Sequence, residues 1–430
     1  MKKDISTSIV LCKLFSAVFI LFLPYSFFAQ GVSGINIDTC IKLAVENYPL
    51  AKQKGYLQAI GDNNLKNLNG SWIPQLSVDL KATEFSEVAS FNIPGFPSMV
   101  FPKDQENFGL NLNQTLFDGG IIAQQKKTDI ANTETEIQKN EVELYKVKDR
   151  IIQLYGSILL TKDNLKILES FMEDVNGRKD KVTSSVQNGT MLQSNLDVLE
   201  AEILKTKQKI IEANSNLKAL CKVISLLINK QVDENSSFAD ISISAVNKTD
   251  SIKRPELKLF DFQQNLMDER IKLSSRKTLP RLVLFGDGAY GRPGYNFLNQ
   301  DFRFYGLVGL NLKWNISSIY SVNYEKKNLM INKKMIDEQK ELFQLNLNTT
   351  MIQQNEEIEK LKQVIEIDKA IVDKRKAVSK STSNQLDNGF ITSSDYLTEL
   401  TAEKQAIFNQ LLHEVQLGIA VRNLNITTGN

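Results

Sequence analysis

The stretch that decides the fold runs from residue 130 to residue 186 and reads IANTETEIQKNEVELYKVKDRIIQLYGSILLTKDNLKILESFMEDVNGRKDKVTSSV. One apolar row recurs in it every seven residues: Ile130, Ile137, Leu144, Ile151, Ile158, Leu165 and Met172, with Val186 two heptads later. A second row with the same period lies three residues further on: Val147, Leu154, Thr161, Leu168, Val175 and Val182. Two such rows form the a and d seam of a coiled coil, and a strict heptad imposes a left-handed supercoil.

The predicted helix is unusually long. No proline occurs between Lys103 and Arg254. A helix from Ile121 to Gln187 would extend about 100 Å at 1.5 Å per residue. That exceeds an ordinary globular helix, and the polar residues between the apolar rows exclude a membrane span. We therefore expect a rod.

The rod should turn back on itself at Asn188–Gly189, because glycine is the usual residue just past a helix end. The segment that follows repeats the heptad pattern and predicts a returning helix. Its first row is Leu196, Ile203, Ile210, Leu217 and Ile224, and its second is Leu199, Ala213, Leu220 and Leu227.

Before the long helix the period changes from seven to two. Leu76, Val78, Leu80 and Ala82 alternate with polar residues, and a second alternation leads up to Leu116–Phe117. Alternation of this kind predicts strands with one apolar and one polar face. We place these strands at about 75–90 and 105–117, with a proline-containing loop between them.

The second half of the chain repeats the first. Ile73–Pro74–Gln75–Leu76 is answered by Leu279–Pro280–Arg281–Leu282, and Gly109–Leu110–Asn111–Leu112 by Gly309–Leu310–Asn311–Leu312. Asn188–Gly189 is answered by Asn388–Gly389. Matched landmarks in one order indicate an internal duplication. The first repeat then covers residues 31–229, a connector 230–252, and the second repeat 253–430, with strands at about 281–290 and 302–316 and hairpin tips at 188–190 and 388–390.

Composition narrows the function classes. The 52 basic and 50 acidic residues balance, so nothing indicates nucleic-acid binding. The single histidine, His413, lies in a helical pattern, and no nucleotide loop, metal-ligand cluster or nucleophile–base pair is present. We therefore expect neither an enzyme nor a cofactor or metal site.

Residues 1–30 read as a secretory signal, with Lys2 and Lys3 before an apolar run. Export would place Cys40 and Cys221 in an oxidising compartment. We expect these cysteines to be either buried small hydrophobic residues or a disulfide.

Four alternating strands cannot close a membrane barrel, whose smallest single-chain examples have about eight. Because open strand edges in lipid are prohibitively costly, several copies must share one barrel. Trp72 and Trp314 fall on the helical side of the strands, where an interfacial aromatic girdle belongs.

The chain resembles the outer-membrane efflux proteins, the TolC-like outer-membrane factors, over essentially the whole mature sequence. The resemblance is carried by the duplication, by Leu116–Phe117–Asp118–Gly119–Gly120 and by the tip glycines. It is also carried by Gly189–Thr190 followed by 197–202 (DVLEAE), and by Gly389 with Asp395–Tyr396–Leu397. One departure is Asn315–Ile316–Ser317–Ser318–Ile319, which replaces a second Leu-Phe-Asp-Gly-Gly.

The resemblance implies a membrane α+β fold: a homotrimer with a twelve-stranded barrel in outer-membrane lipid, standing on a helical periplasmic tunnel. It implies that a periplasmic adaptor and an inner-membrane pump are partners. It also implies that Cys40 and Cys221 lie in the same middle region of the tunnel, where the first helix and the end of the returning helix belong. An acidic ring at the closed periplasmic mouth would use Asp395, with Asn195 and Asp197 at the equivalent place in the first repeat. The adaptor would dock at Gly189, Thr190, Gly389 and Phe390. Lys380 and Asp387 are candidates for inter-helix ties that keep the mouth shut.

Two functions of different class follow from these features. The first is a passive exit duct of a tripartite efflux or type I secretion system. The second is a coiled-coil structural or adhesive surface protein, which long heptads alone would suggest. The strands favour the duct, because an adhesin has no need of membrane-type strands between helical repeats.

Overall fold

The computed structural model describes residues 35–91, 94–95, 99–241 and 252–429. The expected signal, 1–30, lies outside these residues, as do residues 242–251 of the connector. The first repeat contains α2 (Ile37–Asn47), the 3₁₀ helix η2 (Pro49–Lys52), α3 (Gln53–Gly70), β1 (Gln75–Glu84), β2 (Ser90–Phe91), β3 (Met99–Val100), β4 (Asp104–Phe117), α4 (Ile121–Gln187) and α5 (Gln193–Ile228). The second contains α6 (Pro255–Arg276), β5 (Arg281–Arg292), β6 (Arg303–Lys313), α7 (Ser318–Asp387) and α8 (Ser393–Thr428).

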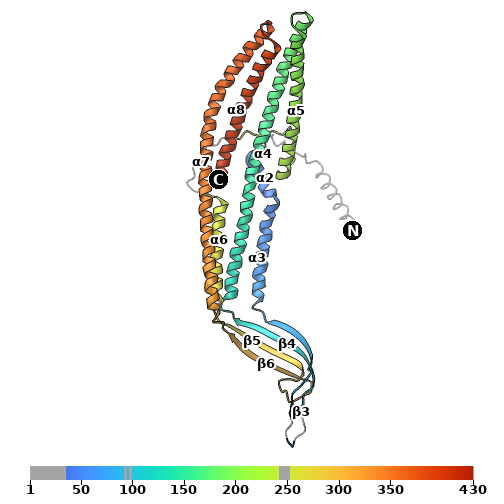
Figure 1. Ribbon diagram of the computed structural model, residues 1–430, viewed down its shortest axis with the longest axis vertical. Helices are drawn as coiled ribbons and strands as arrows, with labels where there is room; N and C mark the ends of the chain where they lie inside the picture. The colour runs from blue at the N-terminus through green and yellow to red at the C-terminus, as the bar shows by residue number, and fades with distance from the viewer. Residues whose placement is uncertain (1–34, 92–93, 96–98, 242–251, 430) are drawn as a thin grey trace, which may run out of the picture.

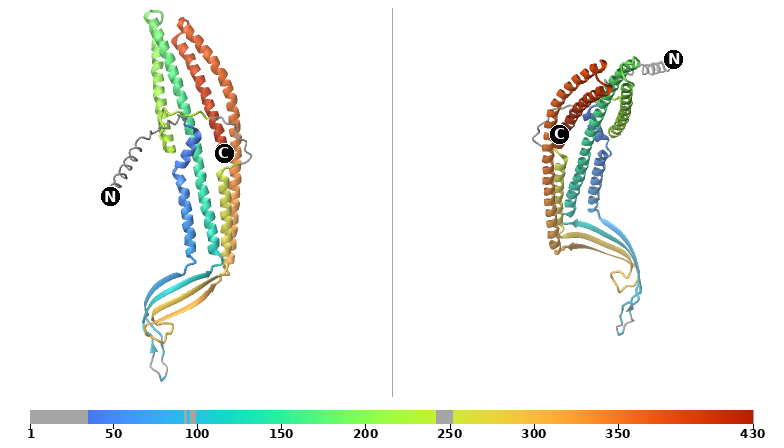
Figure 2. Two further views of the ribbon diagram at one scale, coloured as in Figure 1. Left: turned by 180° about the vertical axis from the view of Figure 1, so that it is seen from behind. Right: turned by 45° about the horizontal axis from the view of Figure 1, so that its top comes forward.

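The molecule is elongated, with both helical hairpin tips at one end and the sheet at the other (Figure 1). Each repeat runs through a shorter helix, a strand pair, a helix of 67 or 70 residues and a returning helix of 36. Both further views show that α4 lies beside α3 near the sheet and beside α5 near the tips (Figure 2). In the same way, α7 lies beside α6 near the sheet and beside α8 near the tips. The two long hairpins are therefore the same structural unit used twice.

The four long strands form one antiparallel sheet in the order β1-β4-β5-β6. Its register aligns apolar residues across all four strands. Leu76 lies opposite Leu112, Val78 opposite Leu110 and Leu80 opposite Phe108. Leu284 lies opposite Leu310, and Leu282 opposite Leu312. One face is consequently apolar and largely exposed, while Ser77, Asp79, Asn111 and Asn113 occupy the other.

The strand limits differ from those expected. β1 ends at Glu84, short of residue 90. Phe85 N still donates to Lys103 O, and the residues after Phe85 leave the sheet. β5 extends to Arg292, where it still pairs with Glu106 of β4. β6 ends at Lys313, short of residue 316, since Asn315 begins the turn that leads into α7.

The main core lies midway along the rod, where α2 and α5 pack on α4. Ile151, Ile158 and Leu165 of the first heptad row are buried there. So are Cys40 and Cys221, which confirms that the two cysteines share one region, and both thiols are free. Burial raises the pKa of the Cys40 thiol to about 11, which leaves it protonated and unreactive at neutral pH.

The heptad interpretation is wrong for the first turns of α4, next to the sheet, whereas Leu144, Val147 and Ile151 further along are buried as predicted. Ile130 is 45% exposed there, and the buried face carries Gln124, Thr128, Thr135 and Gln138. These side chains use backbone groups as partners, as when Gln138 Nε2 donates to Pro255 O at 2.8 Å. The seam therefore changes from polar to apolar along a single helix.

Among the described residues, no helix has an apolar stretch long enough to cross a membrane.

Candidate functional site

The two hairpin tips have the same geometry. Gly189 and Gly389 both adopt φ +73°, a left-handed conformation that side chains with a Cβ disfavour. The next residue closes each turn in the same way, since Thr190 N donates to Ser185 O and Phe390 N to Gln385 O, both at 2.9 Å. Phe390 is 79% exposed at its tip. The two tips are therefore equivalent turns, and the second one exposes an aromatic ring.

Asn195 joins the two hairpins. Its Oδ1 accepts a hydrogen bond of 2.9 Å from Ser393 N, at the first residue of α8. A side chain from α5 therefore caps an orphan N–H of a helix in the other repeat. Asp197 serves its own helix instead, accepting from Gln193 Nε2 at 2.9 Å, and it is exposed.

Asp395 forms a capping box at the start of α8. Thr392 Oγ1 accepts from Asp395 N at 3.2 Å, and the Asp395 carboxylate accepts from Thr392 N at 3.0 Å. The hydrogen bonds from the Thr392 side chain and backbone lower the pKa of Asp395. In one chain, this carboxylate is therefore ionised, exposed and held at the helix N-terminus.

Below the tips, Arg178 of α4 connects the two repeats. It is buried and donates to the Asp387 carboxylate, to Ser383 Oγ and to Ser383 O. Its guanidinium also lies 4.9 Å from the ring centre of Tyr396 on α8. One side chain on α4 thereby contacts both α7 and α8.

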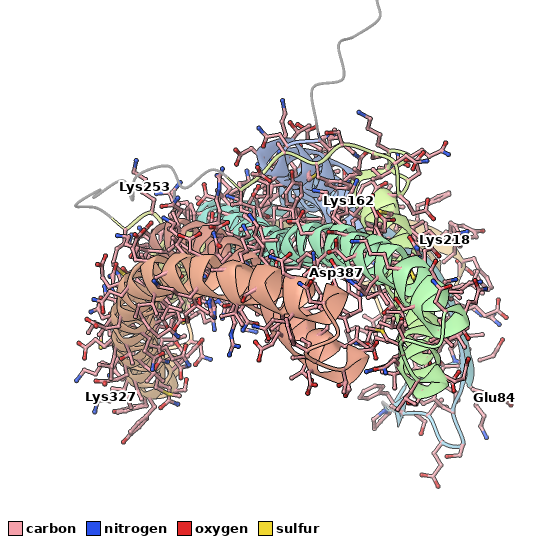
Figure 3. All side chains as sticks on the ribbon, turned by 90° about the horizontal axis from the view of Figure 1, so that it is seen from above. Glu84, Lys162, Lys218, Lys253, Lys327 and Asp387 are labelled. Carbon is pink, nitrogen blue, oxygen red and sulfur yellow. The ribbon has the colours of Figure 1, made fainter. Side chains whose placement is uncertain are left out.

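Lys181 adds a second cation to this cluster at 3.3 Å from Asp387. Burial alone would raise the pKa of Asp387, but the hydrogen bonds and charges of Arg178 and Lys181 outweigh it and lower the pKa. Viewed from the tips, Asp387 lies between α7 and α4 (Figure 3). The expected tie through Asp387 is present, but Lys380 makes none of the ion pairs found among the described residues.

The sequence contains a signal for Arg178, although the heptad rows alone do not include it. Arg178 lies three residues after Val175 and four before Val182, so it occupies the same helix face as these two buried residues. A charged residue on a buried face needs a partner. The identity of that partner depends on how the second repeat packs on the first, which periodicity along one helix does not show.

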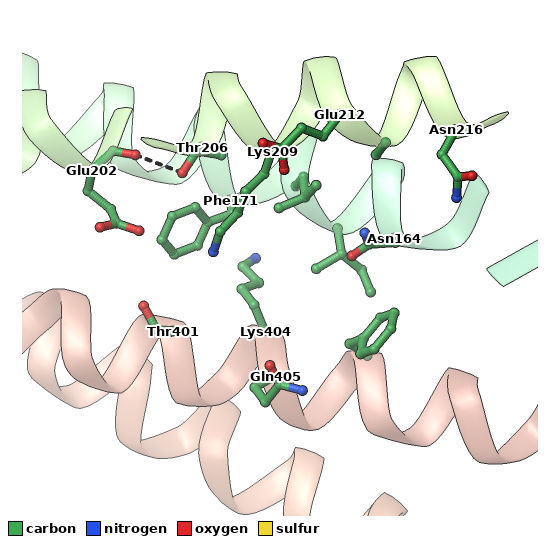
Figure 4. A pocket seen from close by; sticks show the side chains of 14 residues that line it. Asn164, Phe171, Glu202, Thr206, Lys209, Glu212, Asn216, Thr401, Lys404 and Gln405 are labelled. Atoms are coloured by element: carbon green, nitrogen blue, oxygen red, sulfur yellow. Dashed lines mark hydrogen bonds between the residues drawn. The ribbon is translucent and has the colours of Figure 1, made fainter. Parts of the chain in front are cut away.

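A crevice of about 500 Å³ lies beside this cluster, between α4, α5 and α8 (Figure 4). Phe171 and Phe408 supply apolar surface, and Lys209 and Glu202 supply charge. Lys404 closes one side by pairing with Asp174 at 2.7 Å. The described residues contain no cluster of three or more His, Cys, Asp or Glu side chains placed to hold a metal ion.

At the other end of the rod, Trp72 and Trp314 flank the sheet where it joins the helices. Trp314 Nε1 donates to Thr278 O at 3.0 Å, and the Trp72 carbonyl accepts from Gln114 Nε2 at 2.9 Å. Both rings are exposed, at 39% and 56%. Both tryptophans therefore lie at the helical end of the sheet.

No family model matches the chain, and no curated protein matches it by sequence. Solved structures do match it over nearly its whole length. The outer-membrane channel OprN is 14% identical, with a TM-score of 0.69, over 91% of this chain and 89% of its own. The CmeC outer-membrane channel of Campylobacter jejuni is 13% identical, with a TM-score of 0.68, over 91% and 85%. The outer-membrane protein VceC of Vibrio cholerae is 11% identical, with a TM-score of 0.65, over 91% and 94%.

The chain has the TolC-like outer-membrane channel fold.

Within the TolC-like fold, this chain builds its two strand-to-helix joints differently. At the first joint Gly119 and Gly120 adopt φ +75° and +79°, and Asp118 Oδ1 accepts from Gly120 N at 2.7 Å. At the second joint Asn315 O accepts from Ser318 N at 3.2 Å and no glycine is used. The departure noted in the sequence thus changes the turn and keeps the path of the chain.

Proposed function

We propose that this protein is the outer-membrane exit duct of a tripartite efflux or type I secretion system. Three copies would share a twelve-stranded barrel, and substrates would pass passively from an inner-membrane pump and a periplasmic adaptor to the outside. The observation that carries the proposal is the continuous apolar face of the four-stranded sheet, aligned residue by residue. Leu80, Phe304 and Val308 on this face are 78–85% exposed. Contact with lipid would remove these apolar side chains from water.

Both edges of the sheet support closure by further copies. β1 and β6 are the outermost strands, and each has one side without a partner among the described residues. Unsatisfied backbone groups are too costly in lipid, so β6 of one copy should pair with β1 of the next. Three copies of four strands give the proposed twelve.

The helical part also has two uncovered sides, as the sheet has two unpaired edges. From the tip end they lie along an arc, with Lys327 of α7 at one end and Lys218 of α5 at the other (Figure 3). The α7 side exposes an apolar stripe at roughly heptad spacing: Tyr324, Ile331, Met335, Leu342, Leu345 and Ile352. The opposite side exposes Tyr56 and Ile60 of α3 and Leu204 and Ile211 of α5. Closing the arc into a ring would bury each stripe against a neighbouring copy.

The apolar face has distinct ends. Trp72 and Trp314 border it on the helical side, and Tyr290, Phe302 and Phe304 form an aromatic cluster near the other end. Arg292, paired with Asp104, follows immediately. Aromatic girdles beside charged rims are typical of the two membrane interfaces. This arrangement supports an outer-membrane location with the helices in the periplasm.

The tips would then form the periplasmic mouth. The Arg178–Asp387 pair and the Asn195–Ser393 hydrogen bond hold α7 and α8 against the first repeat. Three copies would bring three Asp395 carboxylates around one axis, where like charges attract cations. We assign adaptor docking to Gly189, Thr190, Gly389 and Phe390, since the exposed tips leave this surface free. Opening would be favoured by an adaptor that binds the released arrangement more tightly.

The structural or adhesive alternative explains the long helices but leaves the apolar sheet face without a role. Planar-bilayer recording of the purified protein separates the two functions, because a duct conducts ions in discrete steps. Val308→Arg on the apolar face should reduce insertion, at a cost of about 2–4 kcal/mol near the midplane.

The matched control is Asn311→Arg, three residues along the same strand but on the polar face. It should insert and conduct. Equal behaviour of the two variants, or a folded wild-type protein that never conducts, would contradict the proposal.

A further inference from the structure

The loop between β5 and β6, residues 293–302, folds back over the polar face of the sheet. Tyr295 in the loop packs edge-on against Tyr305 of β6, with ring centres 5.0 Å apart at 74°. The Tyr305 ring also covers Gly294, where an added Cβ would lie 2.9 Å from Tyr305 Cδ1. Tyr305 lies opposite Ala289 and in the row next to Arg303 and Gly291, so it belongs to the polar face.

Tyr305 is itself held in place across a neighbouring strand. Its hydroxyl accepts a 2.7 Å hydrogen bond from Asn107 Nδ2 on β4, so the side chain extends over β5. β5 carries Ala289 and Gly291 opposite these two residues. These small residues leave room for the ring to lie flat. The platform under the loop is therefore built from three strands.

The loop is also tied to the hairpin formed by β2 and β3. Phe297 packs against Phe101, with ring centres 6.1 Å apart, and Phe101 packs against Phe91 at the same distance. Gln300 Nε2 donates to Val100 O at 2.7 Å. Anchors on two sides fix the loop over the polar face and prevent it from extending away from the sheet.

The anchored loop still exposes large apolar side chains. Tyr295 is 54% exposed, Phe297 56% and Leu298 55%. Exposure of three such residues in one short loop is costly in water, yet the loop lies on the side of the sheet that carries Asp79, Asn111 and Asn113. In a barrel with the polar face inside, these rings border the passage.

We propose that loop 293–302 forms a second constriction, at the outer end of the channel. This proposal rests on the proposed function. One loop from each copy narrows the outer mouth with an aromatic rim made by Tyr295 and Phe297. The rim limits the size of solutes that pass and presents them with an apolar surface. It acts in series with the periplasmic mouth and is independent of the tip contacts.

Polymer exclusion in planar bilayers tests this constriction. Polyethylene glycols of graded size are added on one side only, and the largest size that still lowers conductance gauges the opening on that side. Tyr295→Ala combined with Phe297→Ala removes exposed rings and leaves the strands intact. Its cut-off from the outer side should shift to larger polymers, while the cut-off from the tip side stays the same. Tyr305→Ala, which removes the platform, should shift the outer cut-off in the same direction.

Phe302→Ala is the matched control, because Phe302 is the last residue of the loop and its ring packs against Tyr290 on the apolar face, away from the passage. Its outer cut-off should equal that of the wild type. An outer cut-off that is identical in wild type and in the double variant would overturn the constriction while leaving the duct standing. A wild-type protein that forms no channel would instead contradict the proposed function.

Discussion

At the scale of single residues, Asp395 shows how one carboxylate can serve two purposes. It caps α8 through Thr392, and it lies beside the tip that we assign to the periplasmic mouth. A capping role depends on an oxygen that accepts hydrogen bonds, whereas a role in an acidic ring depends on the charge. Substitutions that separate oxygen from charge therefore separate the roles.

We predict that Asp395→Asn weakens cation selectivity and keeps the melting temperature close to that of the wild type, because the amide oxygen can still accept from Thr392 N. Asp395→Ala should lower both, since it removes charge and cap together. Reversal potentials in a salt gradient and thermal denaturation measure the two properties. Unchanged cation selectivity in Asp395→Asn would show that Asp395 caps α8 and has no role in an acidic ring.

The cysteines are another case where the sequence was informative at the residue scale. Cys40 and Cys221 lie far apart in the chain, but the resemblance to the outer-membrane efflux proteins placed both of their helices in the middle of the rod. The structure confirms their shared core and resolves the open choice in favour of free thiols. Spacing could not decide this, because a disulfide depends on the distance and direction of two Cβ atoms.

At the scale of elements, the sequence predicted α4 at its observed limits, Ile121–Gln187, and both hairpin turns. The long helix was predictable because periodicity and the absence of proline are local properties. The polar seam at Gln124, Thr128, Thr135 and Gln138 was not, because it depends on segments distant in sequence: Gln124 and Gln138 donate to backbone carbonyls of α6. The same limit applies to Arg178. Its position on the buried face of α4 follows from the spacing, but its partners on α7 and α8 depend on how the two repeats pack.

The contact between α4 and α7 gives a prediction with a defined pH dependence. The pKa of Asp387 is lowered in the folded chain, so its contribution to stability is complete above the ordinary pKa of aspartate and is lost as the pH falls through the lowered value. Wild-type conductance should therefore stay constant from pH 7 down to about pH 5, since aspartate normally titrates near 4.

Asp387→Asn should raise conductance already at pH 7, because it leaves Arg178 buried beside a neutral partner. The substitution should weaken the contact between α4 and α7 by about 1–3 kcal/mol. This is less than for a fully buried pair, because Asp387 is partly exposed. Lys380→Gln, on the same helix, is the control and should conduct like the wild type. A closed Asp387→Asn channel would show that this pair does not hold the mouth.

At the scale of the whole molecule, a single chain leaves strand edges unpaired and apolar surfaces exposed. Its sheet has two open edges, its helices form an open arc, and apolar stripes line both sides of that arc. The sequence indicated this incompleteness through the count of four strands. The arc itself and the inturned loop 293–302 were not predictable, since both depend on packing between segments distant in sequence.

The central claim is that three copies close one barrel and one tunnel, and the mass of the detergent-solubilised complex tests it most directly. We predict a single species of three chains by native mass spectrometry, which resists dissociation because separating the copies would expose strand edges and the α7 stripe together. A stable, folded monomer in detergent would contradict the account.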